Sequence, residues 1–368
     1  MQCSQMIDMK RCHVLFAICL LSISTMTAQT DSVPQKVWTF DGVAGLNTTS
    51  TNFVNWYSGG KSTTSAMTFA KLHLLYQKGS IAWETNFDSD YGMAWTDQDE
   101  NSVKKTSDKI KLTSKLGWEF KPSWYLTFFV NFQSQYSVGR EMKKGYDPPV
   151  SMWLAPSYTD LSIGIDWKTS FKNCHISLYA SPLTVLLTTA YVSDYWNKHY
   201  SEEYRNAVPE EPYYDFREEM QIRYITFKIV RDAEGRPDVS MRNLRAEVGP
   251  ALKGSIAYRQ KKMTLNSNFS LFTTYQGRGY NVKEAYEATH PGETWDIYFH
   301  YSNTNRQFGR FDIDWDTNLT YQLAKFLNVS INTSLRYYPG LAIANKKGEY
   351  GERVQFKNVL GIGLGYSF

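Results

Sequence analysis

Charged side chains recur at every second position in several segments of this sequence. Carboxylates with this spacing are Asp88 and Asp90, with Glu84 on the same face, and Asp312, Asp314 and Asp316; amines follow it around Lys111. Successive side chains of a β-strand point to opposite faces, so each series lies on one face of a strand. The candidate charged set is Lys71, His73, Glu84, Asp88, Asp90, Lys109, Lys111, Lys115, Asp312, Asp314, Asp316, Arg336, Arg353 and Lys357.

The strands that carry these charges are predicted by hydrophobic alternation. Period-two alternation continues almost without interruption from Trp38 onward, and no segment shows a sustained helical stripe. One face is apolar and the other polar in the hairpin from Ala66 to Met93 and in the next from Ile110 to Phe132. The same pattern through the closing segment at 353–368 predicts twelve strands.

The connections between these strands alternate in length. Those near residues 78, 122, 170, 260 and 323 are short, whereas the others are long and polar. Short turns on one rim and long loops on the other are typical of bacterial outer-membrane barrels, whose even strand number places both termini in the periplasm. A soluble sandwich, the alternative, would not sort its loops so strictly. We predict an all-β fold: a transmembrane, antiparallel, up-and-down β-barrel with short periplasmic turns and long extracellular loops.

The largest connection, at about 191–242, departs from the alternating pattern. It carries acidic pairs such as Glu202-Glu203 and Glu210-Glu211, and we predict an extracellular loop. A strand from Met220 to Val230 that crossed the membrane would instead raise the count to fourteen.

Two interpretations of the charged inner face are open. In one, separate acidic and basic columns line an aqueous pore and produce a transverse field that orients charged or dipolar solutes. In the other, the charges meet as salt bridges that fill a narrow barrel, because buried charges must be paired. The aromatic residues Phe69, Tyr125, Phe129 and Phe272 also point inward and would narrow a channel.

Specific cross-strand pairs follow from the expected turns. A two-residue turn at Lys78-Gly79 places His73 opposite Glu84. A three-residue turn from Leu323 to Lys325 places Asp312 opposite Arg336.

The sequence offers little support for an enzyme. Its histidines lack metal-ligand spacing, and no serine lies in a nucleophile-elbow motif. His300 near Asp296 and His199 near Asp194 could form rim hydrolase sites, but loop histidines are usually solvated. We therefore predict no catalytic, cofactor-binding or metal residues, no cofactor, and no enzymatic activity.

The N-terminal segment has the features of a secretory signal. Lys10 and Arg11 precede an apolar run from Val14 to Ile23, and small residues end at Ala28. We predict a signal peptide at 1–28, a periplasmic lead at 29–36 and the barrel at 37–368. Cleavage leaves Cys174 as the only thiol, which excludes an intrachain disulfide.

Composition is compatible with this arrangement. After the signal no run of eighteen apolar residues remains to form a membrane-spanning helix. The net charge of +4 is too small to indicate nucleic-acid binding. Aromatic residues make up 15% of the chain, as expected for the interfacial belts of a barrel.

The closing strand carries an expected insertion signal at Leu364, Tyr366 and Phe368, which the barrel-insertion machinery reads during biogenesis. We expect this strand to pair with the first strand near Trp38. Asn358 lies on its lipid-facing side, which predicts a local bulge.

Several short sequence motifs together resemble those of one known family. They are Asn55-Trp56 with Gly59-Gly60, Ser107-Asp108-Lys109 leading to Ser114-Lys115, Asn131-Phe132, Ala155-Pro156, Ser181-Pro182-Leu183-Thr184, Ile313-Asp314-Trp315 and Gln355-Phe356-Lys357-Asn358-Val359-Leu360-Gly361. The chain resembles a Bacteroidota outer-membrane β-barrel family catalogued as domain of unknown function number 3078. It departs from that pattern at Tyr337-Tyr338-Pro339 and in the inserts after Tyr191 and Tyr275. The resemblance implies a location in the outer membrane of a Gram-negative cell and no established activity.

Function is predicted from the inner face. We expect an integral outer-membrane, porin-like channel or transport protein for small polar solutes. The alternative is a plugged structural barrel whose extracellular loops dock envelope partners or surface glycans. Membrane lipid and the insertion machinery are the expected partners, and nucleic acid is not.

Overall fold

The computed structural model describes most of the chain after residue 36. The described residues are 37–51, 63–96, 103–140, 146–224, 226–231, 233, 235, 237–275, 278–280, 304–306, 308–339, 342–344 and 350–367. Residues Trp38–Phe368 form one compact unit. The predicted signal peptide and lead lie outside the described residues, so their boundaries stay predictions.

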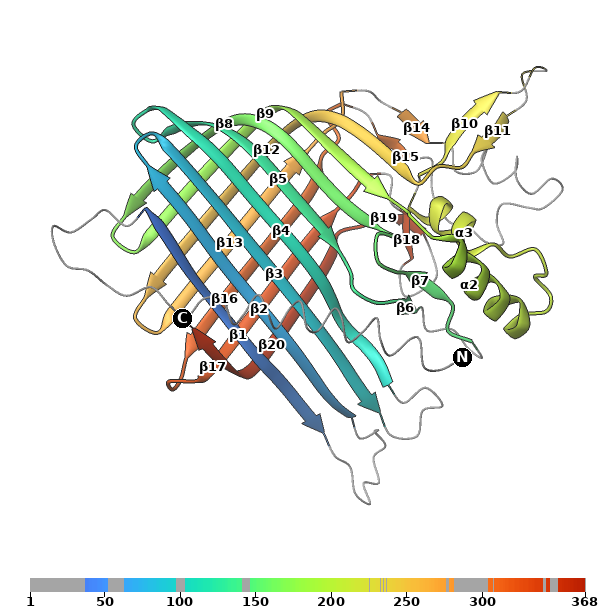
Figure 1. Ribbon diagram of the computed structural model, residues 1–368, viewed down its shortest axis with the longest axis horizontal. Helices are drawn as coiled ribbons and strands as arrows, with labels where there is room; N and C mark the ends of the chain where they lie inside the picture. The colour runs from blue at the N-terminus through green and yellow to red at the C-terminus, as the bar shows by residue number, and fades with distance from the viewer. Residues whose placement is uncertain are drawn as a thin grey trace. The chain divides into compact units, whose positions relative to one another are not determined.

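Twelve antiparallel strands close into a barrel in which neighbours along the chain pair with each other (Figure 1). This confirms the predicted fold and strand count. The barrel strands are β1 (Trp38–Thr51), β2 (Thr63–Lys78), β3 (Ile81–Thr96), β4 (Val103–Lys121), β5 (Trp124–Ser134), β8 (Ser157–Phe171), β9 (Cys174–Thr189), β12 (Leu244–Gln260), β13 (Met263–Phe272), β16 (Asp312–Gln322), β17 (Leu327–Tyr337) and β20 (Gln355–Ser367).

The outer surface of the barrel is apolar. On β4, for example, Leu112, Leu116 and Trp118 are exposed at alternate positions. A closed barrel leaves no unpaired strand edge, and an apolar exterior is stable only in lipid. The barrel therefore spans a membrane with its strands.

The register of two hairpins differs from the prediction. His73 lies opposite Asn86, not Glu84, because the turn occupies Gly79-Ser80, one residue later than expected. Gly79 has φ +57°, a conformation that tight hairpin turns require and glycine adopts readily.

The second difference has the same form. Asp314, not Asp312, lies opposite Arg336, because Gln322 pairs with Asn328 and the connection is two residues longer than expected. Both shifts are by two residues, so each side chain keeps its predicted face.

The barrel closes between β1 and β20, as predicted. The pairing runs from Val43–Ser367 to Asn47–Gly363, whereas Trp38 pairs only with Tyr76 of β2. Closure of a sheet with tilted strands requires such a stagger. The bulge predicted at Asn358 is absent, because β17 and β20 pair without a register shift; nothing in the structure explains an exposed asparagine on this outer face.

The long connections contain secondary structure of their own. The 191–242 connection holds α2 (Asp194–Ala207), α3 (Phe216–Arg223) and a hairpin of β10 (Lys228–Arg231) with β11 (Pro237–Ser240). The expectation of no helical segment was therefore wrong, and Met220–Val230 is not a membrane-crossing strand. The other small pairs are β6 (Gly139–Arg140) with β7 (Pro149–Ser151), β14 (Arg278–Tyr280) with β15 (Thr304–Arg306), and β18 (Ala342–Ala344) with β19 (Tyr350–Glu352).

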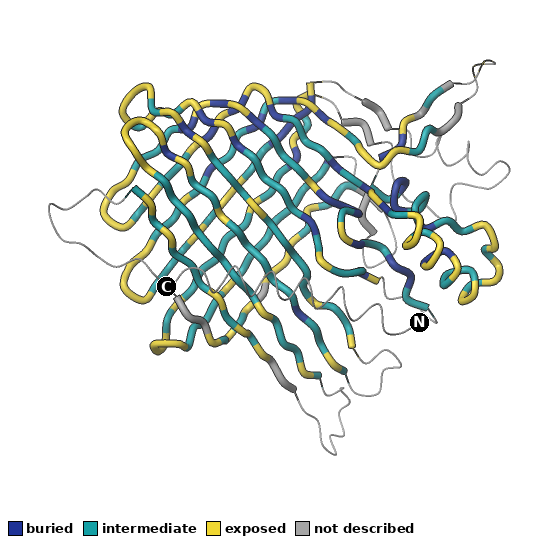
Figure 2. The backbone as a smooth tube through the Cα atoms, in the orientation of Figure 1, coloured by how far each residue is buried: buried dark blue, intermediate teal, exposed yellow. Residues whose placement is uncertain are grey.

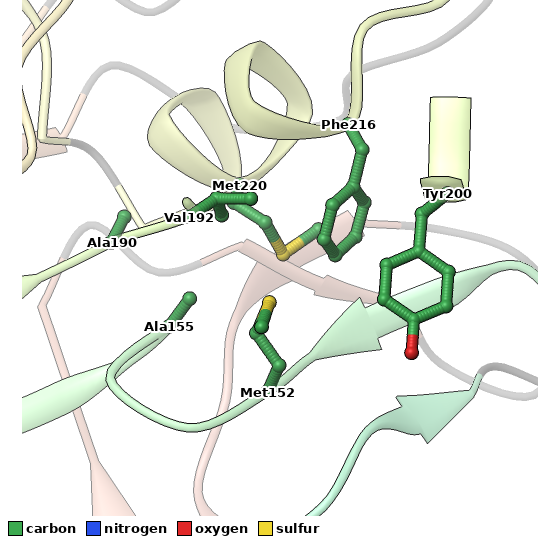
Figure 3. Close-up of a cluster of buried hydrophobic side chains, with 7 residues drawn as sticks. All are labelled: Met152, Ala155, Ala190, Val192, Tyr200, Phe216 and Met220. Atoms are coloured by element: carbon green, nitrogen blue, oxygen red, sulfur yellow. The ribbon is translucent and has the colours of Figure 1, made fainter. Parts of the chain in front are cut away.

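The two helices pack on the neighbouring β5–β8 connection through a small hydrophobic core. Figure 3 shows side chains from both segments converging there, with the ring of Phe216 next to Met220. The core comprises Met152, Ala155, Ala190, Val192, Tyr200, Phe216 and Met220. Within the described ranges, no helix is long and apolar enough to cross a membrane.

Candidate functional site

Contacts between strands that are not neighbours identify the inner face of the barrel. Lys115 on β4 places Nζ 3.4 Å from Asp166 Oδ2 on β8, past the intervening β5. The Lys253 ammonium on β12 lies 3.7 Å from the centre of the Phe129 ring on β5. Such contacts are possible only across the concave side of the sheet. The charged face of the strands therefore lines the lumen.

One half of the inner wall, on β5, β8, β9 and β12, is densely packed. Asp166 and Tyr179 are completely buried, and the Ser177 hydroxyl donates to Asp166 over 2.6 Å. Lys253 forms an ion pair with Asp160, and the two side chains are only 12% and 14% exposed. Buried positions also gather along β8, β9 and β12 in Figure 2. This half of the lumen is filled by side chains.

The opposite half, on β3, β4, β16 and β17, is accessible. Lys109 lies 2.9 Å from Asp88 and 3.1 Å from Asp90, yet its side chain is 33% exposed. Arg336 contacts Asp316, whose side chain is 40% exposed although it faces inward. Exposure of inward-facing residues means that water-sized space remains beside this half of the wall.

In the accessible half, two cations each contact two carboxylates. Lys109 binds both Asp88 and Asp90. Arg336 binds Asp314 and Asp316 at 2.8 and 2.7 Å, and Ser334 and Tyr338 add hydroxyl donors to these carboxylates.

A histidine between two acids connects β1, β2 and β3. His73 Nδ1 lies 3.0 Å from Asp41 and Nε2 lies 3.5 Å from Glu84. Glu84 is thus a diagonal partner of His73, although the two residues are not directly opposite.

The structure brings most, but not all, of the predicted charged set into contact. Glu84, Asp88 and Asp90 lie opposite Lys115, Lys111 and Lys109 in the sheet register. Lys71, Lys111 and Lys357 make no side-chain hydrogen bond or ion pair with any described residue. Asp312 is buried at the start of β16, and Arg353 lies just before β20.

The expected insertion signal is only partly described. Leu364 is exposed on the outer face. The Tyr366 side chain and Phe368 lie outside the described residues.

Several inner-wall charges were missed from the sequence. Asp41, Asp160, Asp166, Lys168 and Lys253 all form ion pairs inside the barrel. The sequence did contain a signal for three of them, because Asp160, Asp166 and Lys168 lie on the same polar face of β8.

Of the two histidine–acid pairs considered as hydrolase sites, the structure describes one, His199 with Asp194, and these two side chains bind other partners. His199 on α2 lies 3.9 Å from Glu203, while Asp194 binds Arg217 at 2.5 Å. His300 and Asp296 lie outside the described residues. Among the described residues, no group of three or more histidine, cysteine or acidic side chains could hold a metal ion.

Outside the membrane, an ionic network links the two packed connections. Arg140 of β6 contacts Glu203 of α2 through both nitrogens, at 2.6 and 3.1 Å, and Tyr146 donates to Glu203 over 2.9 Å. Burial opposes ionisation of Glu203, but these hydrogen bonds outweigh it and lower the pKa of the Glu203 carboxyl. Burial, together with the bond to Glu203, raises the pKa of Tyr146 to about 12.

Comparison with known families supports the resemblance seen in the sequence. The profile of the family described as "Protein of unknown function (DUF3078)" matches residues 48–139. The match confirms the expected resemblance over these residues. DUF3078 carries no activity in its description, and the expected Bacteroidota origin stays a prediction. No curated protein matches the sequence significantly.

Solved structures similar to this chain are β-barrels. The NanC porin has 9% sequence identity and a TM-score of 0.34, with 89% of this chain and 99% of that chain covered. The translocator domain of the autotransporter NalP from Neisseria meningitidis has 10% identity and a TM-score of 0.32, with 99% and 97% covered. The closed sheet and apolar exterior described above make this chain an integral outer-membrane β-barrel.

Proposed function

We propose that this barrel is a channel for small polar solutes. The observation that carries the proposal is the accessible half of the inner wall, where Lys109, Asp316 and Arg336 remain partly exposed inside a closed barrel. A channel requires polar groups that a solute can contact, and a fully packed lumen would have covered them.

The charges of this half-wall favour dipolar solutes. Asp314 and Asp316 share Arg336, which leaves about one negative charge uncompensated on β16. On the opposite wall, Asp88 and Asp90 share Lys109. Lys111 on β4, six strands away from β16, adds a cation with no ion-pair partner among the described residues. Its charge acts on both Asp314 and Asp316. A zwitterion can contact opposite charges on opposite walls, whereas a simple ion is repelled by one of them.

The test is conductance and solute uptake by the purified barrel in planar bilayers and liposomes. We expect Lys111→Gln to shift ion selectivity toward cations and Asp316→Asn to shift it toward anions. Lys198→Gln, the same charge change on the exposed face of α2, should leave selectivity unchanged. If a correctly folded barrel shows neither conductance nor solute uptake, the channel proposal is refuted.

A docking function is the second candidate, because the packed connections carry exposed aromatic rings. Tyr195 and Trp196 on α2 contact each other with centroids 4.9 Å apart, and both are exposed. If this surface binds a surface glycan, Trp196→Ser should abolish polysaccharide binding and leave conductance unchanged. Unchanged binding would exclude the surface. In both candidates the barrel performs no catalytic step.

A further inference from the structure

One row of outward-facing side chains crosses five strands on the packed half of the barrel. In the sheet register, Leu126 lies beside Ile165, Ile165 beside Ala180, Ala180 beside Leu252, and Leu252 beside Leu271. Ala180 is the smallest member of the row and stands between two bulky neighbours. The row is therefore hollowed at β9.

A bulge in β9 lies beside this hollow. The register shifts between Ile163 and Ile165 on one side of β9 and between Gly249 and Ala251 on the other. Pro182 and Pro250 lie at these shifts, and proline cannot donate to a strand ladder.

Side chains replace the ladder bonds that are lost at the bulge. The Ser181 hydroxyl lies 2.8 Å from the carbonyl oxygens of Ile163 and Leu183. The Tyr275 hydroxyl donates to the Pro182 carbonyl over 2.6 Å. The irregularity is thus a stabilised part of the fold.

The resulting groove measures about 870 Å³ and opens onto the outer surface. It is lined by Leu126, Ile163, Gly164, Ile165, Ala180, Ser181, Pro182, Pro250, Ala251, Leu252, Leu271 and Phe311. The lining contains no charged side chain, and its one hydroxyl, on Ser181, is already engaged by two carbonyl acceptors. A sugar, an ion or a peptide would lose its hydration here without finding partners.

The shape and place of the groove select its occupant. Its lining residues come from five neighbouring strands, which span about 19 Å at the usual strand spacing, and from Phe311, so the groove extends across the strands. It is continuous with the exposed apolar exterior that meets the membrane, since Leu126 and Ile165 belong to both. We propose that this groove holds a single acyl chain of a membrane phospholipid.

Native mass spectrometry of the full barrel, released from bilayers containing both phosphatidylethanolamine and lipopolysaccharide, tests the site. We expect one phospholipid to stay bound under activation that removes all others. Ala180→Phe should reduce its occupancy at least tenfold by filling the hollow. Ala70→Phe makes the same change on the outward face of β2, away from the groove, and should retain the lipid.

Equal retention by wild type and Ala180→Phe would overturn the proposal, as would retention of lipopolysaccharide in place of phospholipid. A second measurement uses only the wild-type barrel, so misfolding of the variant cannot affect its result. Electron paramagnetic resonance with an acyl-chain spin label should show one immobilised phospholipid per barrel, and a fully mobile spectrum would also overturn the proposal.

Discussion

The ion pair between Lys253 and Asp160 should contribute far more to stability than the one between Arg336 and Asp316. Both pairs lie inside the barrel, but the first is almost completely buried and the second is 28% and 40% exposed. Removal of one partner from a buried pair leaves an uncompensated charge and costs about 3–5 kcal/mol. An exposed pair contributes roughly 0.2–1 kcal/mol.

We therefore expect Lys253→Met to lower the free energy of unfolding by about 3–5 kcal/mol. Loss of the cation–π contact with Phe129 is part of this effect. Arg336→Met should cost about 1 kcal/mol or less. Urea-induced unfolding in phospholipid vesicles, followed by tryptophan fluorescence, measures both values.

The double variant Lys253→Met with Asp160→Asn separates the pair from simple packing. Because it removes both charges, it should recover most of the stability lost by Lys253→Met alone. Equal costs for Lys253→Met and Arg336→Met, or no recovery in the double variant, would refute the distinction between a packed and an accessible half of the lumen.

Three further predictions concern other parts of the chain. Gly249→Ala should destabilise the barrel by about 1–3 kcal/mol, since a Cβ there would overlap the Thr273 carbonyl oxygen, and unchanged urea midpoints would contradict this. Leu112→Arg, in the middle of the outer face of β4, should cost about 2–4 kcal/mol in bilayers; a smaller cost in bilayers than in detergent would argue against lipid contact. Because the folded Glu203 pKa is lowered, its stabilisation is present above the ordinary glutamate pKa and is lost as pH falls through the lowered value. Proteolysis of the 191–242 connection should therefore increase in acid for wild type and become insensitive to pH in Glu203→Gln.

Hydrophobic alternation predicted the faces of the strands but not their exact pairing. Every side chain keeps its face when a strand slips by two residues, so the pattern cannot distinguish Asp312 from Asp314 as the partner of Arg336. That choice depends on the length of the connection after Gln322. The left-handed Gly79 sets the register of the first hairpin in the same way.

The helices of the long connection were missed because a search for period two does not detect them. One signal was available. Asp215 caps α3 by accepting a hydrogen bond from the Glu218 backbone, and an aspartate followed three residues later by glutamate is a recognised helix start.

The division of the lumen into two halves could not be predicted from strand parity. Lys109 and Lys253 both occupy inward positions, yet only Lys253 is covered. The difference arises from the rings of Phe129 and Tyr179, whose centres lie 5.8 Å apart and whose packing strand parity does not specify.

The seam between β1 and β20 has a mechanical consequence. Its ladder runs only from Val43 to Asn47, whereas every other pair of neighbouring barrel strands is joined along a longer stretch. Gly45 pairs with Gly365 there, so the middle of this short ladder has no cross-strand side-chain contact. Heat or a pulling force will therefore unzip the barrel along this line first, and amide hydrogens at 43–47 will exchange with solvent ahead of those in the neighbouring ladders.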